Sequence, residues 1–269
     1  MKEIAALLVG IDKYPMFPLS FCVNDLRRVR HYFESGVYAP EEENLRMLTD
    51  EAATREGILD GLKWLCEQDA KTALFYYSGH GTTLPDLDGD EGSGNPDTAI
   101  VPVDWSNGLL VDDEIKFALE TVNSEKLIAV FDCCHSGRMD RAFDFLRLKF
   151  SSAIQYRRRR AIDSAYVPKT LLVQAFDRAR SLAYRIENPK LVSIAACLPD
   201  EVAEETVFDN GEGNGVLTNF LFDSVSSYSK ASYESVITAT RKRVKAANFA
   251  QHIQLRAGNP ALLKNRFLR

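Results

Sequence analysis

Short apolar runs alternate along the chain with segments whose apolar residues recur at helical spacing. The first run, Ile4–Ile11, is almost continuously apolar, which is typical of a strand buried on both faces of a sheet. The same pattern predicts strands at Leu45–Leu48, Thr72–Ser78, Lys126–Asp132, Leu191–Cys197 and Ala261–Leu263.

The intervening segments predict helices. Asn24 is expected to cap a helix that runs to Phe33, and Thr54 to cap a second one, because short polar side chains accept the free N–H groups of a helix start. Val216–Val225 and Tyr233–Val244 are amphipathic in the same way. Strands that alternate with helices indicate an α/β fold with a mainly parallel sheet covered on both faces, and residues 1–269 are expected to form one domain.

Composition and charge narrow the class of protein. With 45% hydrophobic and 26% charged residues, the chain has the composition of an ordinary soluble protein. The formal net charge of −5 gives no support for binding nucleic acid. The apolar runs fall short of the roughly 20 residues that span a membrane, and the first one ends in Gly10-Ile11-Asp12 instead of a cleavage site. We therefore expect a cytoplasmic protein that binds no membrane.

Two of the predicted strands end in reactive side chains. YYSGHG at 76–81 carries His80, and FDCCHSG at 131–137 carries two adjacent thiols, Cys133 and Cys134. The carboxyl ends of parallel strands meet at one edge of a sheet, where ligands bind. The motifs are therefore expected to face each other.

The adjacent thiols allow three interpretations: a disulfide, a metal site or a nucleophile. The chain has five dispersed cysteines, and neighbouring cysteines bridge each other only with strain. The spacing that zinc requires is absent. A thiol beside His80 is the arrangement of a Cys–His dyad, in which the N–H groups of Gly81 and of the nucleophile could hold an oxyanion. The pattern alone does not choose between Cys133 and Cys134.

Two segments are expected to be surface loops. Residues 85–97 are rich in Asp, Gly and Pro, but Glu91 stands where an EF-hand loop requires glycine. Residues 138–189 are highly charged and contain QYRRRRA at 155–161. A run of four arginines is usually a solvated face.

Several segments together resemble the metacaspases and their bacterial relatives, which are caspase-like cysteine peptidases. These segments are LLVGIDKYP, LSFCVNDLRRV, YYSGHG, DTAIVPVDW, LLVDDEI, AVFDCCHSG, ACLPDEVAEE and GNGVLTNFLF. The resemblance implies a caspase-like fold with a central sheet of about six strands. It is poor over residues 141–189, a region that varies in the family and often holds processing sites.

The resemblance also implies roles for single residues. His80 matches the general base and acid, and Cys134 matches the nucleophile, which makes the choice that the pattern left open. The family cleaves after Arg or Lys, and its first specificity pocket is matched by Cys22, Asp25, Ser78 and Asp132. The ordinary interpretation of Asp25 is an acid at a helix start, and that of Asp132 an acid at a strand end. Cys66 and Cys197 are expected in the core.

Calcium and processing are further expectations from the resemblance. No cofactor is obligatory throughout the family, but many members need Ca²⁺, and the aspartates of that site are matched by Asp97, Asp112, Asp113 and, with a shift of one residue, Asp140. An enzyme that cuts after arginine carries its own arginines in the variable loop, so we expect cleavage there, by itself or by an upstream protease. The residues concerned are Arg157, Arg158, Arg159 and Arg160.

The resemblance also bears on the oligomeric state. Metacaspases tend to be monomers, so a monomer is expected here.

Two other functions compete with a cysteine endopeptidase acting on proteins. The first is a catalytically latent caspase-fold module for interaction or signalling, since some relatives have lost the dyad. The second is a nucleotide-binding protein. The loop after the first strand, GIDKYPMFP, has no glycine-rich phosphate motif, which speaks against nucleotide binding.

Overall fold

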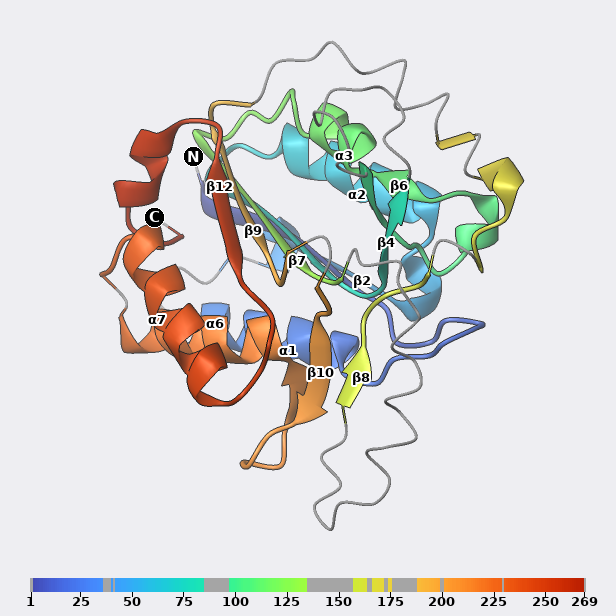
Figure 1. Ribbon diagram of the computed structural model, residues 1–269. Helices are drawn as coiled ribbons and strands as arrows, with labels where there is room; N and C mark the ends of the chain where they lie inside the picture. Colours follow the sequence, from blue (N-terminus) through green and yellow to red (C-terminus); the bar gives the residue numbers. More distant parts are fainter. Residues whose placement is uncertain are drawn as a thin grey trace.

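The structure is a computed structural model of the chain (Figure 1). It describes residues 2–35, 40, 42–84, 97–134, 157–163, 166–171, 174–175, 188–198, 201–228 and 230–268. His135 and Asp140 lie outside the described residues, as does most of the two expected loops.

A six-stranded sheet forms the centre of the molecule. Its strand order is β12-β9-β7-β3-β1-β2, and every neighbouring pair is parallel except β12 with β9. The strands are β1 (Lys2–Gly10), β2 (Leu45–Thr49), β3 (Ala70–Ser78), β7 (Lys126–Asp132), β9 (Leu191–Ala195) and β12 (Gln254–Ala257). The expected α/β fold with a mainly parallel sheet of about six strands is confirmed.

Helices cover both faces of this sheet (Figure 1). Ala5, Leu7 and Val9 of β1 point to the face covered by α2 (Arg55–Glu67) and α3 (Asp112–Ala118). Ile4 and Leu8 point to the other face, which is covered by α1 (Cys22–Glu34), α6 (Val216–Ser227) and α7 (Tyr233–Ala246). The continuous apolar run of β1 is thus explained, because both faces of the strand are buried.

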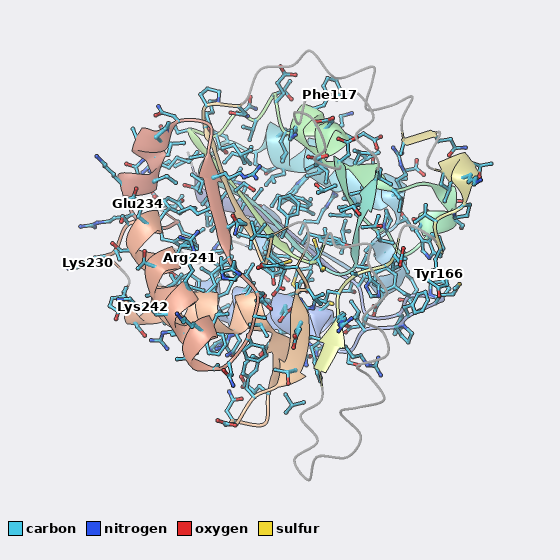
Figure 2. The ribbon with its side chains drawn as sticks, in the orientation of Figure 1. Phe117, Tyr166, Lys230, Glu234, Arg241 and Lys242 are labelled. Atoms are coloured by element: carbon cyan, nitrogen blue, oxygen red, sulfur yellow. The ribbon has the colours of Figure 1, made fainter. Side chains whose placement is uncertain are left out.

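The outer helices are amphipathic, as their spacing predicts. On α7, Val236, Ile237 and Val244 are buried. Glu234, Arg241 and Lys242 point to the surface (Figure 2). No helix in the described part of the chain combines the length and the apolar composition that a membrane span requires.

Two local predictions were wrong. The first helix begins at Cys22 instead of after Asn24, because the carboxylate of Asp12 accepts the N–H groups of Cys22 and Val23 and so replaces a local cap. The strand expected at Ala261–Leu263 is part of a 3₁₀ helix, Pro260–Lys264, whose first residue is a proline after the capping Asn259. The last strand of the sheet is β12 instead.

Two small antiparallel sheets extend the strand ends. One has the order β11-β10-β8, from β8 (Arg157–Arg159), β10 (Glu204–Val207) and β11 (Gly213–Gly215). The other has the order β4-β5-β6, from β4 (Gly81–Leu84), β5 (Asp97–Ile100) and β6 (Leu110–Val111). Further 3₁₀ helices lie at Glu42–Asn44, Asp50–Ala52 and Trp105–Asn107. The expectation of a single domain over residues 1–269 stays a prediction.

The cap of α2 gives a direct test of this reading of the fold. The Thr54 hydroxyl accepts the N–H of Gly57 at 3.0 Å. We expect Thr54→Ala to lower the free energy of unfolding by about 1 kcal/mol, and Thr54→Ser to lower it much less because the oxygen is kept. Urea unfolding of both variants measures this. Equal losses in the two variants would show that the hydroxyl is not what stabilises the helix.

Candidate active site

Parallel pairing brings the expected pocket residues together. Ser78 and Asp132 are the last residues of β3 and β7 and are partners in the register of the sheet. Cys22 and Asp25 lie in the first turn of α1, which follows β1, the other neighbour of β3. All four side chains are fully buried. The expected grouping thus follows from the sheet order.

The guanidinium of Arg160 fills the space between these residues. Its Nη2 lies 2.7 Å from Oδ2 of Asp25, and its Nη1 lies 2.7 Å from the Ser78 hydroxyl and 3.2 Å from Oδ1 of Asp132. Arg160 is itself fully buried. The expectation that the arginine run is a solvated face is wrong for Arg160, because buried acidic groups surround its side chain.

Glu205 supplies a third carboxylate. Its Oε2 lies 3.4 Å from Nη2 of Arg160, and its two oxygens also accept the N–H groups of Ser20 and Phe21. Burial raises the pKa of Glu205, while the charge of Arg160 acts in the opposite direction. Burial also raises the pKa of Asp132, and the charge of Arg160 again acts to lower it. The pocket therefore places three carboxyl groups around one guanidinium, and burial favours the neutral form of two of them.

Neighbouring polar groups hold the carboxylates in place. Asp25 accepts bonds from the Asn214 side chain at 3.0 Å and from the N–H of Gly215 at 2.9 Å. Asp132 accepts the N–H of Thr218 at 2.9 Å and its hydroxyl. A Cβ on Gly215 would lie 2.3 Å from Oδ2 of Asp132, so only glycine fits at this position.

The backbone around Arg160 is held as tightly as its side chain. The N–H groups of Gly81 and Cys134 both donate to the Arg160 carbonyl oxygen, each at 3.1 Å. The N–H of Arg160 donates to the carbonyl of Ala203, and that of Ile162 donates to the carbonyl of Gly81. The preceding residues form β8 and pair antiparallel with β10. The chain thus crosses the strand ends in an extended conformation.

The Cys134 thiol and the His80 imidazole lie at the same strand ends, each with a backbone partner. The thiol donates to the carbonyl of Glu201 at 2.7 Å. Nε2 of His80 lies 2.6 Å from the carbonyl oxygen of Phe17, and its ring packs on Tyr14 at 4.5 Å between centroids. Nδ1 of His80 is buried and has no hydrogen-bond partner in the described part of the chain. Burial lowers the pKa of His80 to about 4.

The aspartates expected to bind calcium are only partly described. Asp97 is buried in β5, and Asp112 and Asp113 form the start of α3. The ammonium of Lys116 lies 3.2 Å from Asp112 and 3.0 Å from Asp113. Lys116 therefore supplies positive charge beside one oxygen of each of these carboxylates, for which a metal ion would compete. Asp140 lies outside the described residues.

Sequence reasoning missed Glu205 and the polar partners Asn214 and Thr218. Glu205 lies in the segment EETV, where nothing distinguishes it from Glu204 until the strand pairing is known.

One group of side chains has the atom types that bind metal ions. Its three ligand-type atoms lie within 4.8 Å of one another and belong to Asp12, Cys22 and Glu205. Both carboxylates in this group accept two backbone N–H groups each, so they fix the start of α1.

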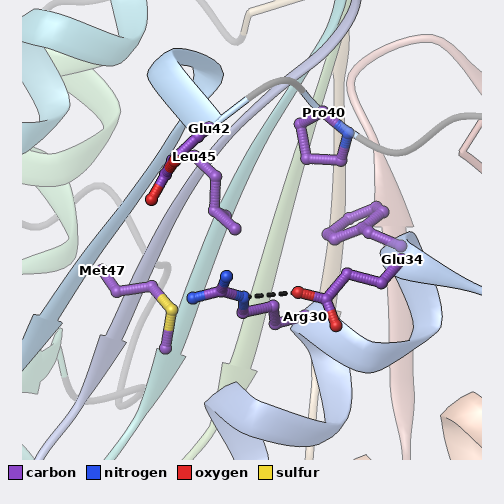
Figure 3. Close-up of a pocket in the computed structure, with 7 residues that line it drawn as sticks. Arg30, Glu34, Pro40, Glu42, Leu45 and Met47 are labelled. Carbon is purple, nitrogen blue, oxygen red and sulfur yellow. Dashed lines mark hydrogen bonds and ion pairs between the residues drawn. The ribbon is translucent and has the colours of Figure 1, made fainter.

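A pocket elsewhere on the molecule is separate from these residues. It opens between α1 and the edge strand β2 (Figure 3), and its polar side chains Arg30 and Glu34 pair with each other at 2.7 Å. Its lining consists of Arg30, Phe33, Glu34, Pro40, Glu42, Leu45 and Met47. We assign it no role.

Comparisons with known proteins identify the class to which this fold and site belong. The caspase domain family matches residues 4–262. A Metacaspase-1 from Meyerozyma guilliermondii is 27% identical over 98% of this chain and 71% of its own length. A Metacaspase-1 from Eremothecium gossypii is 38% identical over 49% of this chain. A Metacaspase-1A from Aspergillus oryzae is 40% identical over 49% of this chain. The matches cover only 31% and 34% of these last two proteins.

A solved structure shows the same fold. A crystal structure of a protein from Geobacter sulfurreducens matches with a TM-score of 0.71 at 21% identity, over 98% of this chain and 97% of that one. The fold is thus that of the caspase-like proteins. The chain belongs to the caspase domain family and is a cysteine-type peptidase similar to the metacaspases, so its substrates are proteins.

The low pKa of His80 predicts a pH-dependent stability. An unfolded imidazole takes up its proton as the pH falls through 6.5, whereas folded His80 does so only near pH 4. The contribution of neutral His80 is therefore complete above pH 6.5 and is lost between pH 6.5 and 4. We expect a Cys134→Ala chain to lose about 2 kcal/mol more between pH 7.5 and pH 5 than Cys134→Ala with His80→Gln. Urea unfolding at both pH values measures this, and equal losses would contradict the burial of a neutral imidazole.

Proposed function

We propose that this peptidase is an endopeptidase that cleaves after Arg, and less well after Lys, with Cys134 as nucleophile and His80 as general base and acid. One observation carries the proposal. The Arg160 carbonyl oxygen is held by the N–H groups of Gly81 and Cys134, while its guanidinium lies among carboxylates. A scissile carbonyl and the side chain before it need this combination of donors and charge.

The chemistry assigned to each group follows from its position. The Cys134 sulfur attacks the carbonyl carbon of the residue in the pocket, and the two N–H groups stabilise the oxyanion that forms. His80 takes the thiol proton and gives it to the leaving amine. The thiol and the imidazole must first leave their bonds to Glu201 and Phe17, which are made in the uncleaved chain. A neutral His80 is the form that can accept the proton.

The pocket favours arginine over lysine by geometry. Nη1 and Nη2 contact different partners, with Ser78 and Asp132 on one side and Asp25 and Glu205 on the other. A planar guanidinium reaches both sides at once, whereas an ammonium is a single point of charge on a shorter reach. Aspartate in this position would add another buried negative charge, which is strongly unfavourable.

The position of Arg160 also supports activation by cleavage within the same chain. Among the four arginines expected to mark a processing site, Arg160 is the one in the pocket, so the bond offered to Cys134 is Arg160–Ala161. While this bond is intact, Arg160 excludes other substrates from a fully buried Cys134. Cleavage of this bond by an upstream protease would likewise open Cys134 to other substrates. The uncleaved chain would then act as a monomeric latent form.

Calcium dependence stays a proposal with separate support. Asp97, Asp112 and Asp113 offer the hard oxygen ligands that Ca²⁺ prefers, but Lys116 pairs with two of them. If calcium binds there, it competes with the ammonium of Lys116 for these oxygens. No other cofactor is part of the proposal.

Fluorogenic peptides ending in Arg, Lys or Asp test the proposed function. We expect cleavage after Arg, at least tenfold weaker cleavage after Lys and none after Asp, because only a guanidinium contacts both sides of the pocket. Cys134→Ala should abolish the activity, whereas Cys133→Ala should retain it. Parallel assays with calcium and with a chelator decide the metal requirement. Cleavage after Asp, or activity in Cys134→Ala, would overturn the assignments.

Substitution of the pocket arginine tests its blocking role. We expect Arg160→Gln to cleave Arg peptides without a lag phase, because the segment loses its ionic contacts with the pocket and can leave Cys134 without being cut. Arg158→Gln is the matched control, since Arg158 is partly exposed and its guanidinium contacts the carbonyl of Pro18 instead of the pocket. It should behave like the unmodified chain. A lag that persists in Arg160→Gln would argue against Arg160 as the blocking residue.

A further inference from the structure

A second thiol lies against that of Cys134. The Cys197 sulfur lies 3.6 Å from the carbonyl oxygen of Glu201, the same oxygen that accepts the Cys134 thiol at 2.7 Å. The neighbouring Cys134 thiol is the main cause, ahead of burial, of a raised pKa at the Cys197 thiol. Cys197 was expected to be an ordinary core residue, and it is buried. Its position beside Cys134 is the unexpected finding.

Strand pairing explains why these two residues meet. Phe131 of β7 and Ala195 of β9 are partners in a parallel register, and the N–H of Ala196 donates to the Phe131 carbonyl. Cys134 and Cys197 follow these residues at the ends of adjacent strands, which lie about 4.8 Å apart. Disulfides bridge Cα atoms that are about 4.4–6.8 Å apart, so neighbouring strand ends can accommodate one. Both side chains belong to the core layer under α6 and α7, whereas Cys133 belongs to the opposite layer.

The simplest interpretation is that two small apolar side chains pack together in a core. That interpretation accounts for Cys197 but not for the shared contact with the proposed nucleophile. A second acceptor, the Cys133 carbonyl, also lies 3.9 Å from the Cys197 sulfur. Glu201 is itself held by two bonds to Leu198, one from the Leu198 N–H to its carboxylate at 3.1 Å and one from its own N–H to the Leu198 carbonyl at 3.0 Å. The two thiols are therefore held together by the backbone.

We propose that Cys134 and Cys197 form an oxidation site, at which hydrogen peroxide converts the nucleophile to a reversible internal disulfide. The thiolate of Cys134 attacks one peroxide oxygen, the O–O bond breaks, and with one proton a sulfenic acid and water form. The Cys197 sulfur then attacks the Cys134 sulfur and the S–O bond breaks. The thiol proton leaves with the hydroxyl group as a second water molecule. An added dithiol reduces the disulfide and restores both thiols.

The order of these steps follows from the surroundings of the two thiols. The neighbouring Cys134 thiol and burial raise the pKa of the Cys197 thiol, so Cys197 stays protonated and does not react with peroxide first. The N–H of Cys134 contacts the Arg160 carbonyl, and the proposed base, His80, lies at the same strand ends. The order of the steps rests on the proposed function, whereas the pairing of the two thiols does not. The disulfide would protect Cys134 from irreversible oxidation to the sulfinic acid.

Peroxide treatment of the full chain tests the proposal by two independent readouts. In the first, non-reducing peptide mapping by mass spectrometry should find the peptides of Cys134 and Cys197 linked, with two hydrogen atoms lost, and dithiothreitol should separate them. This readout requires no peptidase activity, so a failure of the proposed function leaves it intact. Absence of the linked peptide, while Cys134 is found as sulfinic acid, would overturn the proposal.

The second readout is recovery of activity on Arg peptides. We expect Cys197→Ser and Cys197→Ala to have the basal activity of the unmodified chain but to recover less than a tenth of it with dithiothreitol after peroxide. The unmodified chain should recover most of its activity. Cys66→Ala is the matched control, because Cys66 is a buried thiol on α2, under the opposite face of the sheet, and its removal should not change recovery. Equal recovery in the Cys197 and Cys66 variants would contradict the assignment.

Discussion

The buried contact between Arg160 and the carboxylates of Asp25, Asp132 and Glu205 is the interaction on which the rest of the site depends. Several carboxylates without water or a cation would be strongly destabilising, so a pocket of this composition requires a positive group. The fold supplies that group from its own chain. In the function we propose, the same requirement makes the pocket selective for a basic side chain of another protein once Arg160 has left.

The parallel sheet allows this arrangement to be built. Adjacent strand ends bring Ser78, Asp132 and Cys134 within reach of the first turn of α1, and β10 with β11 closes the remaining side with Glu205 and Gly215. Residues 157–159 then pair with β10 as strand β8, and Arg160, which follows them, places its carbonyl between two N–H groups. The proposed specificity and the proposed latency would therefore have one physical cause, which is that the chain binds its own arginine as it would bind a substrate.

Much of the fold and part of the candidate site were predictable from the sequence, and the features that were not have physical reasons. The apolar run of β1 and the spacing on α7 predict their elements because burial sets both patterns. The pocket residues came from the resemblance, and the sheet register explains their grouping. The burial of Arg160 could not be predicted, because four successive arginines look alike until strand pairing places one at the strand ends. Glu205 was missed for the same reason. Asn24 was taken for a cap because the cap that forms comes from Asp12, which lies ten residues before Cys22.

The central claim is that Arg160 occupies the site as the first substrate of its own chain. Intact mass spectrometry of the purified chain over time, at two protein concentrations and beside Cys134→Ala, tests it most directly. The account predicts a single first break between Arg160 and Ala161, at a rate that does not change on dilution, and no break in Cys134→Ala. A chain that cleaves Arg peptides yet stays at full length, or that is first cut elsewhere, would contradict it.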